Sequence, residues 1–380
     1  MKTTTFFLLA AFLFQNFCFQ PQQTFAQSPD IPDSDAFYRT AMKTKPARDY
    51  TKQINDLLRK MTLEEKVGQM TQLTMGMFVS GRDQDVRIDE AKLDKAINKY
   101  GVGSFLNVND QALTIDKWHE IIGRIQAVSM KTRLKIPNLY GIDSIHGANY
   151  VRGATLFPQE IGMAATWNPV LMQRASEITA METRAAGIPW SFSPVLDIGR
   201  QPLWARFWET FGEDPYLAKV MGVSFVRGLE GDDISSEKHI AACLKHYMGY
   251  SLPLTGRDRT SALIPENYLR EYVKPTFESA IGAGAHTVMI NSAEINGVPG
   301  HANKKILTDM LRGEMKFQGL AVSDWEDIKK LVTQWRVAKD EKEATQMAIM
   351  AGIDMSMVPL DYSFADILIE LVKEKKGSDD

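Results

Sequence analysis

Short apolar runs alternate with amphipathic segments along this 380-residue chain. The runs have the length of buried strands, and the segments between them carry apolar residues at the three-to-four-residue spacing of helices. Regular alternation of strand and helix predicts an α/β fold with a parallel sheet. The number of units favours an irregular (β/α)8 TIM-type barrel over an open sheet. Strands are predicted at 101–106, 139–142, 188–192, 240–244, 286–290, 320–322 and 354–358, and helices from 62 onward and over 88–100, 116–130, 165–186, 215–229, 265–283, 303–314 and 341–351.

Length and charge narrow the class of partner. A chain of 380 residues allows two domains, or one (β/α) barrel of about 250 residues with insertions. Lys and Arg (44) nearly balance Asp and Glu (47), which gives a formal net charge of −3. This balance gives no reason to expect nucleic acid or an anionic membrane as a partner. The expected partner is therefore small and neutral.

The first 26 residues have the pattern of a secretory signal. Lys2 is the only charged side chain before Asp30, residues 6–14 are all apolar, and Ala26 ends a small-residue cleavage site. The apolar run is shorter than the ~20 residues that span a bilayer, so no membrane anchor is expected. The pattern predicts a periplasmic or secreted protein with signal 1–26, an N-terminal arm at 27–50 and a barrel at 51–380.

Cysteine use agrees with a core that needs no cross-link. Cys18 would leave with the signal, so only Cys243 remains and no intrachain disulfide is expected. Because Cys243 lies in the apolar run 240–244, we expect it to be a small buried hydrophobic residue.

Polar and charged groups follow several of the predicted strands. In a parallel barrel the carboxyl ends of strands carry the chemistry, so these groups are expected to meet in one site. The alternatives are that Asp324 caps the next helix, that Trp325 packs in the core, and that the basic residues are solvated surface cations. The candidate site residues are Asp143, Arg206, Lys245, His246, Asp324 and Trp325.

The residue types favour a sugar ligand. Sugar hydroxyls pair with carboxylates and basic groups, and the apolar face of a pyranose suits an aromatic ring such as Trp325. The segment 352–356 has one glycine, unlike the glycine-rich loops that bind phosphate late in such barrels. The six His show no spacing typical of metal ligands. We therefore expect no metal and no other cofactor.

Five motifs occur in order along the chain: MTLEEKVGQM at 61–70, YGID at 140–143, FGEDP at 211–215, KHYMGY at 245–250 and VSDW at 322–325. Together they resemble the N-terminal catalytic barrel of glycoside hydrolase family 3, and within it the exported bacterial β-glucosidases. The resemblance implies that Asp324 is the catalytic nucleophile and that Trp325 forms an aromatic wall. It also implies that Asp143, Arg206, Lys245 and His246 hold the hydroxyls of the released sugar.

A member with these residues is expected to be a retaining, exo-acting β-glucosidase that removes terminal β-D-glucosyl residues through a covalent intermediate on Asp324. Lys245 and Arg206 are expected to keep this carboxylate ionised. The KHYMGY motif lacks the Pro-Gly-His pattern of the family's single-domain N-acetylglucosaminidases, so that branch is disfavoured.

The acid/base residue is not evident in the sequence. Two-domain family members take it from a second α/β domain after the barrel, and this chain is expected to stop before the closing helix and that domain. Glu294 and Asp258 are fallback candidates. Two other functions stay open: a sugar-binding barrel without turnover, and an aldolase or lyase with a Schiff base on Lys245.

Overall fold

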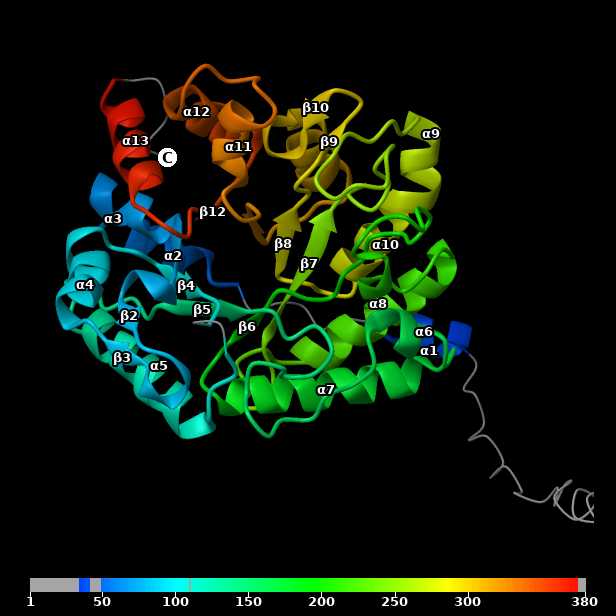
Figure 1. Ribbon diagram of the computed structural model, residues 1–380, viewed down its shortest axis with the longest axis horizontal. Coiled ribbons are helices and arrows are strands. Elements are labelled where there is room, and N and C mark those ends of the chain that lie inside the picture. Colours follow the sequence, from blue (N-terminus) through cyan, green and yellow to red (C-terminus); the bar gives the residue numbers. More distant parts are fainter. Residues whose placement is uncertain (1–33, 42–48, 109–110, 375–380) are drawn as a thin grey trace, which may run out of the picture. The chain divides into compact units, whose positions relative to one another are not determined.

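The computed structural model of the chain describes residues 34–41, 49–108 and 111–374 (Figure 1). The predicted signal segment and most of the arm lie outside these residues. Among the described residues, no helix combines the length and the apolar character that crossing a bilayer requires.

Eight parallel strands form the centre of the fold, which confirms the predicted barrel. Their spatial order follows the chain from β1 to β11, and β12 pairs with β1 at Thr71↔Ser356. A single bridge, Val322↔Met355, joins β11 to β12 and brings the sheet close to full closure. The strands are β1 (Thr71–Thr74), β4 (Ser104–Leu106), β5 (Leu139–Ile142), β6 (Trp190–Ser191), β7 (Ala241–Tyr247), β8 (Thr287–Ile290), β11 (Leu320–Val322) and β12 (Ser356–Met357).

Helices lie outside the strands (Figure 1). The α-helices are α1 (Ser34–Ala41), α2 (Thr51–Leu58), α3 (Leu63–Gln69), α4 (Glu90–Asp94), α5 (Ile115–Ser129), α6 (Glu160–Ala164), α7 (Pro169–Ala185), α8 (Pro215–Glu230), α9 (Glu266–Tyr268), α10 (Lys274–Gly282), α11 (Asp327–Thr333), α12 (Glu341–Ala351) and α13 (Ser363–Lys373). Segments of π-helix also occur: η3 (Lys95–Lys99) continues α4, η5 (Leu269–Val273) joins α9 to α10, and η7 (Lys305–Glu314) stands alone between the turn η6 (Gly300–Ala302) and β11. Two hairpins, β2 (Val79–Ser80) with β3 (Arg87–Ile88) and β9 (Glu294–Ile295) with β10 (Val298–Pro299), extend from loops.

Two differences from the sequence prediction concern the ends of the barrel. Strand β1 was not predicted, because three of its four residues, in the sequence Thr-Gln-Leu-Thr, are polar. These residues are nevertheless buried, and Gln72 Nε2 donates to Ser104 Oγ at 2.8 Å. The expectation that the chain stops before the closing helix is wrong, because the amphipathic segment Ser363–Lys373 forms α13 after β12.

Residues of each strand alternate between two cores. Cys243, Met289 and Val322 belong to a cluster inside the barrel, whereas their neighbours face the helices. This alternation follows from the two-residue period of a strand. It confirms that Cys243 is a buried apolar residue, whose thiol pKa burial raises to about 12.

The helix start predicted at Thr62 is also present. Thr62 Oγ1 accepts the Glu65 N–H at 3.2 Å, and the Glu65 carboxylate accepts the Thr62 N–H at 2.9 Å. This reciprocal capping box satisfies two N–H groups that have no partner within the helix.

Candidate active site

The predicted site residues lie at the carboxyl ends of neighbouring strands. Asp143 follows β5, Lys245 and His246 lie directly before Tyr247, the last residue of β7, and Asp324 and Trp325 follow β11. Arg206 lies in the loop after β6, immediately before the 3-10 turn η4 (Phe207–Glu209). Ion-pair contacts between side chains from different strands, described below, confirm that the fold brings several of these groups together.

Asp324 is a buried carboxylate with donors on both oxygens. Its Oδ1 accepts the Trp325 N–H at 2.5 Å, and its Oδ2 accepts the Ser292 hydroxyl at 2.7 Å. Arg259 Nη2 lies 3.7 Å from Oδ1. The alternative that Asp324 caps the next helix is not supported, because Glu326 is the N-cap residue of α11 and no side chain caps this helix.

These contacts keep Asp324 ionised. Burial alone would raise its pKa, but the Arg259 guanidinium together with the Ser292 and Trp325 donors holds the pKa well below its usual range. The His246 ring adds to this lowering only in its protonated form. An ionised carboxylate at a strand end, fixed by donors on both oxygens, is the form that a nucleophile requires.

His246 is oriented by Asp197, a buried residue that the sequence analysis did not select. The His246 Nδ1 lies 2.9 Å from Asp197 Oδ2, which also accepts the His246 backbone N–H at 3.0 Å. Burial lowers the pKa of His246 well below its ordinary value, so the ring is neutral. With the proton on Nδ1, Nε2 is an acceptor 4.0 Å from Asp324 Oδ2, where a sugar hydroxyl could donate to it.

Lys245 pairs with Asp143 rather than with Asp324. Lys245 Nζ lies 2.5 Å from Asp143 Oδ1; the lysine is buried and the carboxylate is about one-third exposed. The expectation that Lys245 and Arg206 hold Asp324 ionised therefore needs correction, because Arg259 is the cation in contact with it. Arg259 was missed because it lies in an irregular loop, where no periodic pattern places side chains.

Arg206 is held by Glu209, three residues further along the chain. Arg206 Nε and Nη2 donate to the two Glu209 oxygens at 2.8 and 2.6 Å. Burial opposes the charge, but the Glu209 carboxylate raises the pKa of Arg206. The guanidinium lies over the Tyr250 ring at 5.6 Å, and this ring meets His246 edge-on at 4.8 Å. Arg206 is therefore rigid beside His246.

Trp325 is half-buried and packs against the cluster inside the barrel. This packing agrees with the core interpretation of Trp325, and its role as an aromatic wall for a sugar stays a prediction. Of the two fallback acids, Asp258 accepts from Trp204 Nε1 at 2.8 Å and lies 3.8 Å from Arg259 Nε. Glu294 lies in the β9–β10 hairpin.

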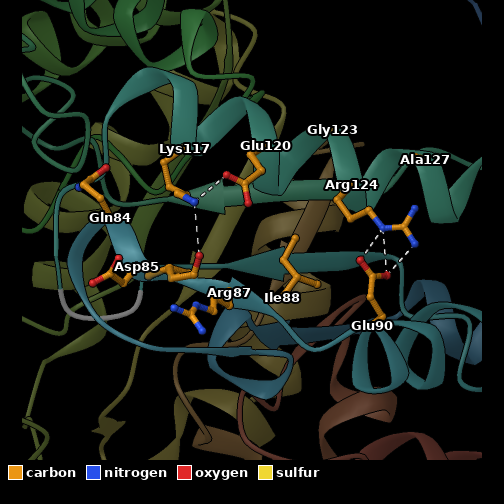
Figure 2. A pocket seen from close by; sticks show the side chains of 11 residues that line it. Gln84, Asp85, Arg87, Ile88, Glu90, Lys117, Glu120, Gly123, Arg124 and Ala127 are labelled. Atoms are coloured by element: carbon orange, nitrogen blue, oxygen red, sulfur yellow. Dashed lines mark hydrogen bonds and ion pairs between the residues drawn. The ribbon is translucent and has the colours of Figure 1, made fainter.

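A separate groove of about 650 Å³ lies between α5 and the segment from β3 to α4. Figure 2 shows two ion pairs in its lining: Lys117 with Glu120 at 2.6 Å, and Arg124 with Glu90 at 2.6 Å. None of the predicted site residues lines it. In the described part of the chain, no group of three or more His, Cys, Asp and Glu side chains is arranged to hold a metal ion.

Known proteins are similar to this chain in sequence. A lysosomal β-glucosidase of Dictyostelium discoideum is 48% identical over 334 residues, which cover 84% of this chain and 40% of that protein. A periplasmic β-glucosidase of Salmonella typhimurium is 30% identical over 335 residues, 88% of this chain and 40% of that protein. This chain thus spans about two-fifths of the length of these relatives.

The solved structure of a Listeria innocua β-glucosidase in complex with glucose superposes with a TM-score of 0.75 and 30% identity. The match covers 86% of this chain and 44% of the Listeria chain. Residues 62–379 match the family described as "Glycosyl hydrolase family 3 N terminal domain". The strand-end carboxylate beside basic groups agrees with this match. The family match and the 48% identical relative show that this chain belongs to glycosyl hydrolase family 3.

Proposed function

We propose that the protein is a retaining, exo-acting β-glucosidase and that this chain supplies its catalytic barrel. The observation that carries the proposal is the ionised carboxylate of Asp324, buried at a strand end and held on both oxygens by Trp325 N–H and the Ser292 hydroxyl. In the first step Asp324 attacks the anomeric carbon, the bond to the leaving oxygen breaks, and a covalent glucosyl ester forms. In the second step water cleaves the ester and releases glucose with retained configuration.

The groups around Asp324 would hold the terminal glucose. The Asp143 carboxylate and the Lys245 ammonium can accept from and donate to sugar hydroxyls through charge-assisted hydrogen bonds. His246 Nε2 and the Arg206 guanidinium offer an acceptor and further donors, and the Trp325 ring provides an apolar wall. Glucosidase relatives, one of them solved with glucose, support this choice of sugar.

The leaving oxygen must be protonated by an acid. A retaining enzyme places this acid about 5 to 5.5 Å from the nucleophile. We assign it to a part of the protein outside these 380 residues, because the relatives are more than twice as long as the matched segment. We also infer an exported enzyme, since residues 1–26 have a signal pattern and the relatives are periplasmic and lysosomal.

Lys245 is a weaker candidate for covalent chemistry. A Schiff-base lysine must lose its proton to attack a carbonyl. Lys245 Nζ is instead held by the Asp143 carboxylate at 2.5 Å, so it is not free to attack a carbonyl. A binding barrel without turnover remains the outcome to expect if no covalent adduct forms in the experiment below.

The test uses 2,4-dinitrophenyl 2-deoxy-2-fluoro-β-D-glucoside, whose leaving group departs without an acid. We expect the 380-residue chain to form a stable glucosyl adduct on the peptide that contains Asp324, detected by mass spectrometry. Cellobiose and alkyl glucosides should be hydrolysed poorly by this chain, because their leaving groups need protonation. Asp324→Asn should abolish labelling, and Asp309→Asn, an exposed substitution in η7, should label normally. An adduct on another carboxylate would refute the assignment of the nucleophile.

A further inference from the structure

Asp327 is a second buried carboxylate beside the nucleophile. It is the first residue of α11, its side chain is almost fully buried, and its backbone N–H donates to the Asp324 carbonyl at 3.2 Å. Nothing in the reaction described above uses it. Its side chain nevertheless reaches Asp324 by two routes, one through Ser292 and one through His301.

The first route runs through the Ser292 hydroxyl, after β8. Ser292 Oγ lies 2.7 Å from Asp324 Oδ2 and also contacts Asp327 Oδ2, while Arg259 Nη1 donates to it. A hydroxyl has one hydrogen and two lone pairs. The arginine takes one lone pair, so if the hydrogen points to Asp324, the contact with Asp327 is a hydrogen bond only when Asp327 is the donor. One of the two carboxylates must therefore be protonated. Because the proposed reaction needs Asp324 as an ionised nucleophile, the proton falls to Asp327 Oδ2.

The second route runs through His301, in the turn η6 (Gly300–Ala302). His301 Nε2 accepts the backbone N–H of Asp324 at 3.1 Å. The ring proton is therefore on Nδ1, which lies 3.8 Å from Asp327 Oδ2. Burial lowers the pKa of His301 to about 3, so this ring is neutral and adds no positive charge beside Asp327.

Charged groups reach Asp327 from three segments. Arg259 Nη1, from the loop after β7, lies 3.3 Å from Oδ1, and Lys330 of α11 also pairs with Oδ1. Asp324 brings a like charge from the end of β11. Burial and this like charge raise the pKa of Asp327 to about 7, against the lowering effect of Lys330 and Arg259. Because both cations contact Oδ1, Oδ2 is the oxygen that can carry the proton.

We propose that Asp327 is a positioning residue. Its protonated Oδ2 donates a hydrogen bond to Ser292 and so directs the Ser292 hydroxyl at the proposed nucleophile Asp324. The inference rests on the proposed role of Asp324. When Asp327 loses this proton to solvent, its carboxylate competes for the only hydroxyl hydrogen. Asp324 then loses a donor and gains a second negative charge nearby. Without this donor the Asp324 carboxylate is no longer fixed in the orientation from which it attacks. The second negative charge also disfavours the ester step, in which Asp324 is released as a carboxylate.

The test follows the rate of covalent labelling by the dinitrophenyl fluoroglucoside from about pH 5 to about pH 9. Because this leaving group needs no protonation, titration of the acid/base residue does not affect the pH dependence of the rate. The unsubstituted chain should label about tenfold more slowly above pH 7 than below it, as expected for a lost hydrogen bond to a charged group. Asp327→Asn keeps a donor to Ser292 but does not titrate, so its rate should stay near the low-pH rate throughout. Ser292→Ala should be slow at every pH.

The control is Asp354→Asn. Asp354 accepts the Ala321 N–H and pairs with Arg312 at the opposite end of β11, so its substitution should leave the decline unchanged. A decline that persists in Asp327→Asn would overturn the proposal, as would a flat profile of the unsubstituted chain.

A second measurement separates this inference from the proposed function. In protein with ¹³C-labelled aspartate carboxyl groups, the resonance that Asp327→Asn removes should titrate near neutral pH. If the chemical shift of that resonance shows the Asp327 carboxyl group fully ionised down to about pH 5, the proposal fails even when Asp324 labels normally. If the resonance titrates but no adduct forms on Asp324, the protonated Asp327 stands and the proposed nucleophile fails. Should Asp327→Asn not fold, the Ser292→Ala rate and the pH profile of the unsubstituted chain decide.

Discussion

Lys245 Nζ lies 2.5 Å from Asp143 Oδ1, although the two residues belong to strands that β6 separates in the sheet. The lysine is buried, and Asp143 is the more exposed member of the pair. In the proposed subsite a sugar would therefore contact the Asp143 carboxylate, which Lys245 holds in place.

Asp143→Ala should weaken glucose inhibition and turnover together. A carboxylate that grips sugar hydroxyls through charged hydrogen bonds contributes about 1.5–3 kcal/mol, so we expect losses of about ten- to a hundredfold in each. The measurement is the inhibition constant for glucose and the turnover number of the full-length enzyme. Asp309→Ala is the matched exposed control. An unchanged glucose affinity would place Asp143 outside the subsite.

Trp325→Ala should separate the contribution of Trp325 to core packing from its contribution to glucose binding. Removing a half-buried indole that packs inside the barrel should lower the melting temperature, since full truncation of a buried Trp costs about 3–5 kcal/mol. If the other part of the ring faces the sugar, the glucose inhibition constant should also rise by about tenfold. Trp167→Ala, which removes an exposed ring, should change neither quantity. A lower melting temperature with unchanged glucose affinity would assign Trp325 to packing alone.

His286 should make stability depend on pH. Its Nδ1 lies 2.8 Å from the buried Glu230 carboxylate, and this hydrogen bond raises the pKa of His286. Because the pKa of His286 is higher in the folded state, its protonated form stabilises the fold. This stabilisation is complete below the unfolded pKa of about 6.5 and is lost as pH rises through the folded pKa. We expect at most about 1 kcal/mol, because the ring is half exposed and solvent screens the pair.

The measurement is the urea midpoint at a pH below and a pH above this range. The midpoint should fall at the higher pH in the unsubstituted chain, and the fall should be smaller in His286→Gln. His119→Gln, a change at an exposed histidine of α5, serves as the control. Equal pH dependence in all three proteins would contradict the assignment.

The predicted fold and the predicted strand-end residues share one physical basis. Leu320–Val322 is apolar because both faces of β11 are buried, and the residues that follow must then lie at the barrel's carboxyl edge. The same logic correctly placed Asp143 after β5 and Lys245 near the end of β7. Periodicity therefore sufficed for these side chains, which lie at the ends of apolar strands.

The residues that sequence reasoning missed lie in loops or act through hydrogen bonds. Arg259 has a positive φ of 54° in an irregular loop, a conformation that no apolar pattern signals. Asp197 and Asp327 are visible in the sequence as acidic residues that follow strands. Their partners, His246 and Ser292, come from other strand ends, so only the closed barrel shows what they bind.

The closure of the barrel at Val322↔Met355 has a consequence for protein synthesis. Strand β11, which leads to Asp324, is supported on one side by β8, made earlier by the ribosome, and on the other by residues that follow it by about thirty positions. Those last residues in turn pair with Thr71 and Gln72, near the first strand to be translated. A nascent chain released before Met355 would carry Asp143, Lys245 and Asp324, yet Asp324 would have support on only one side.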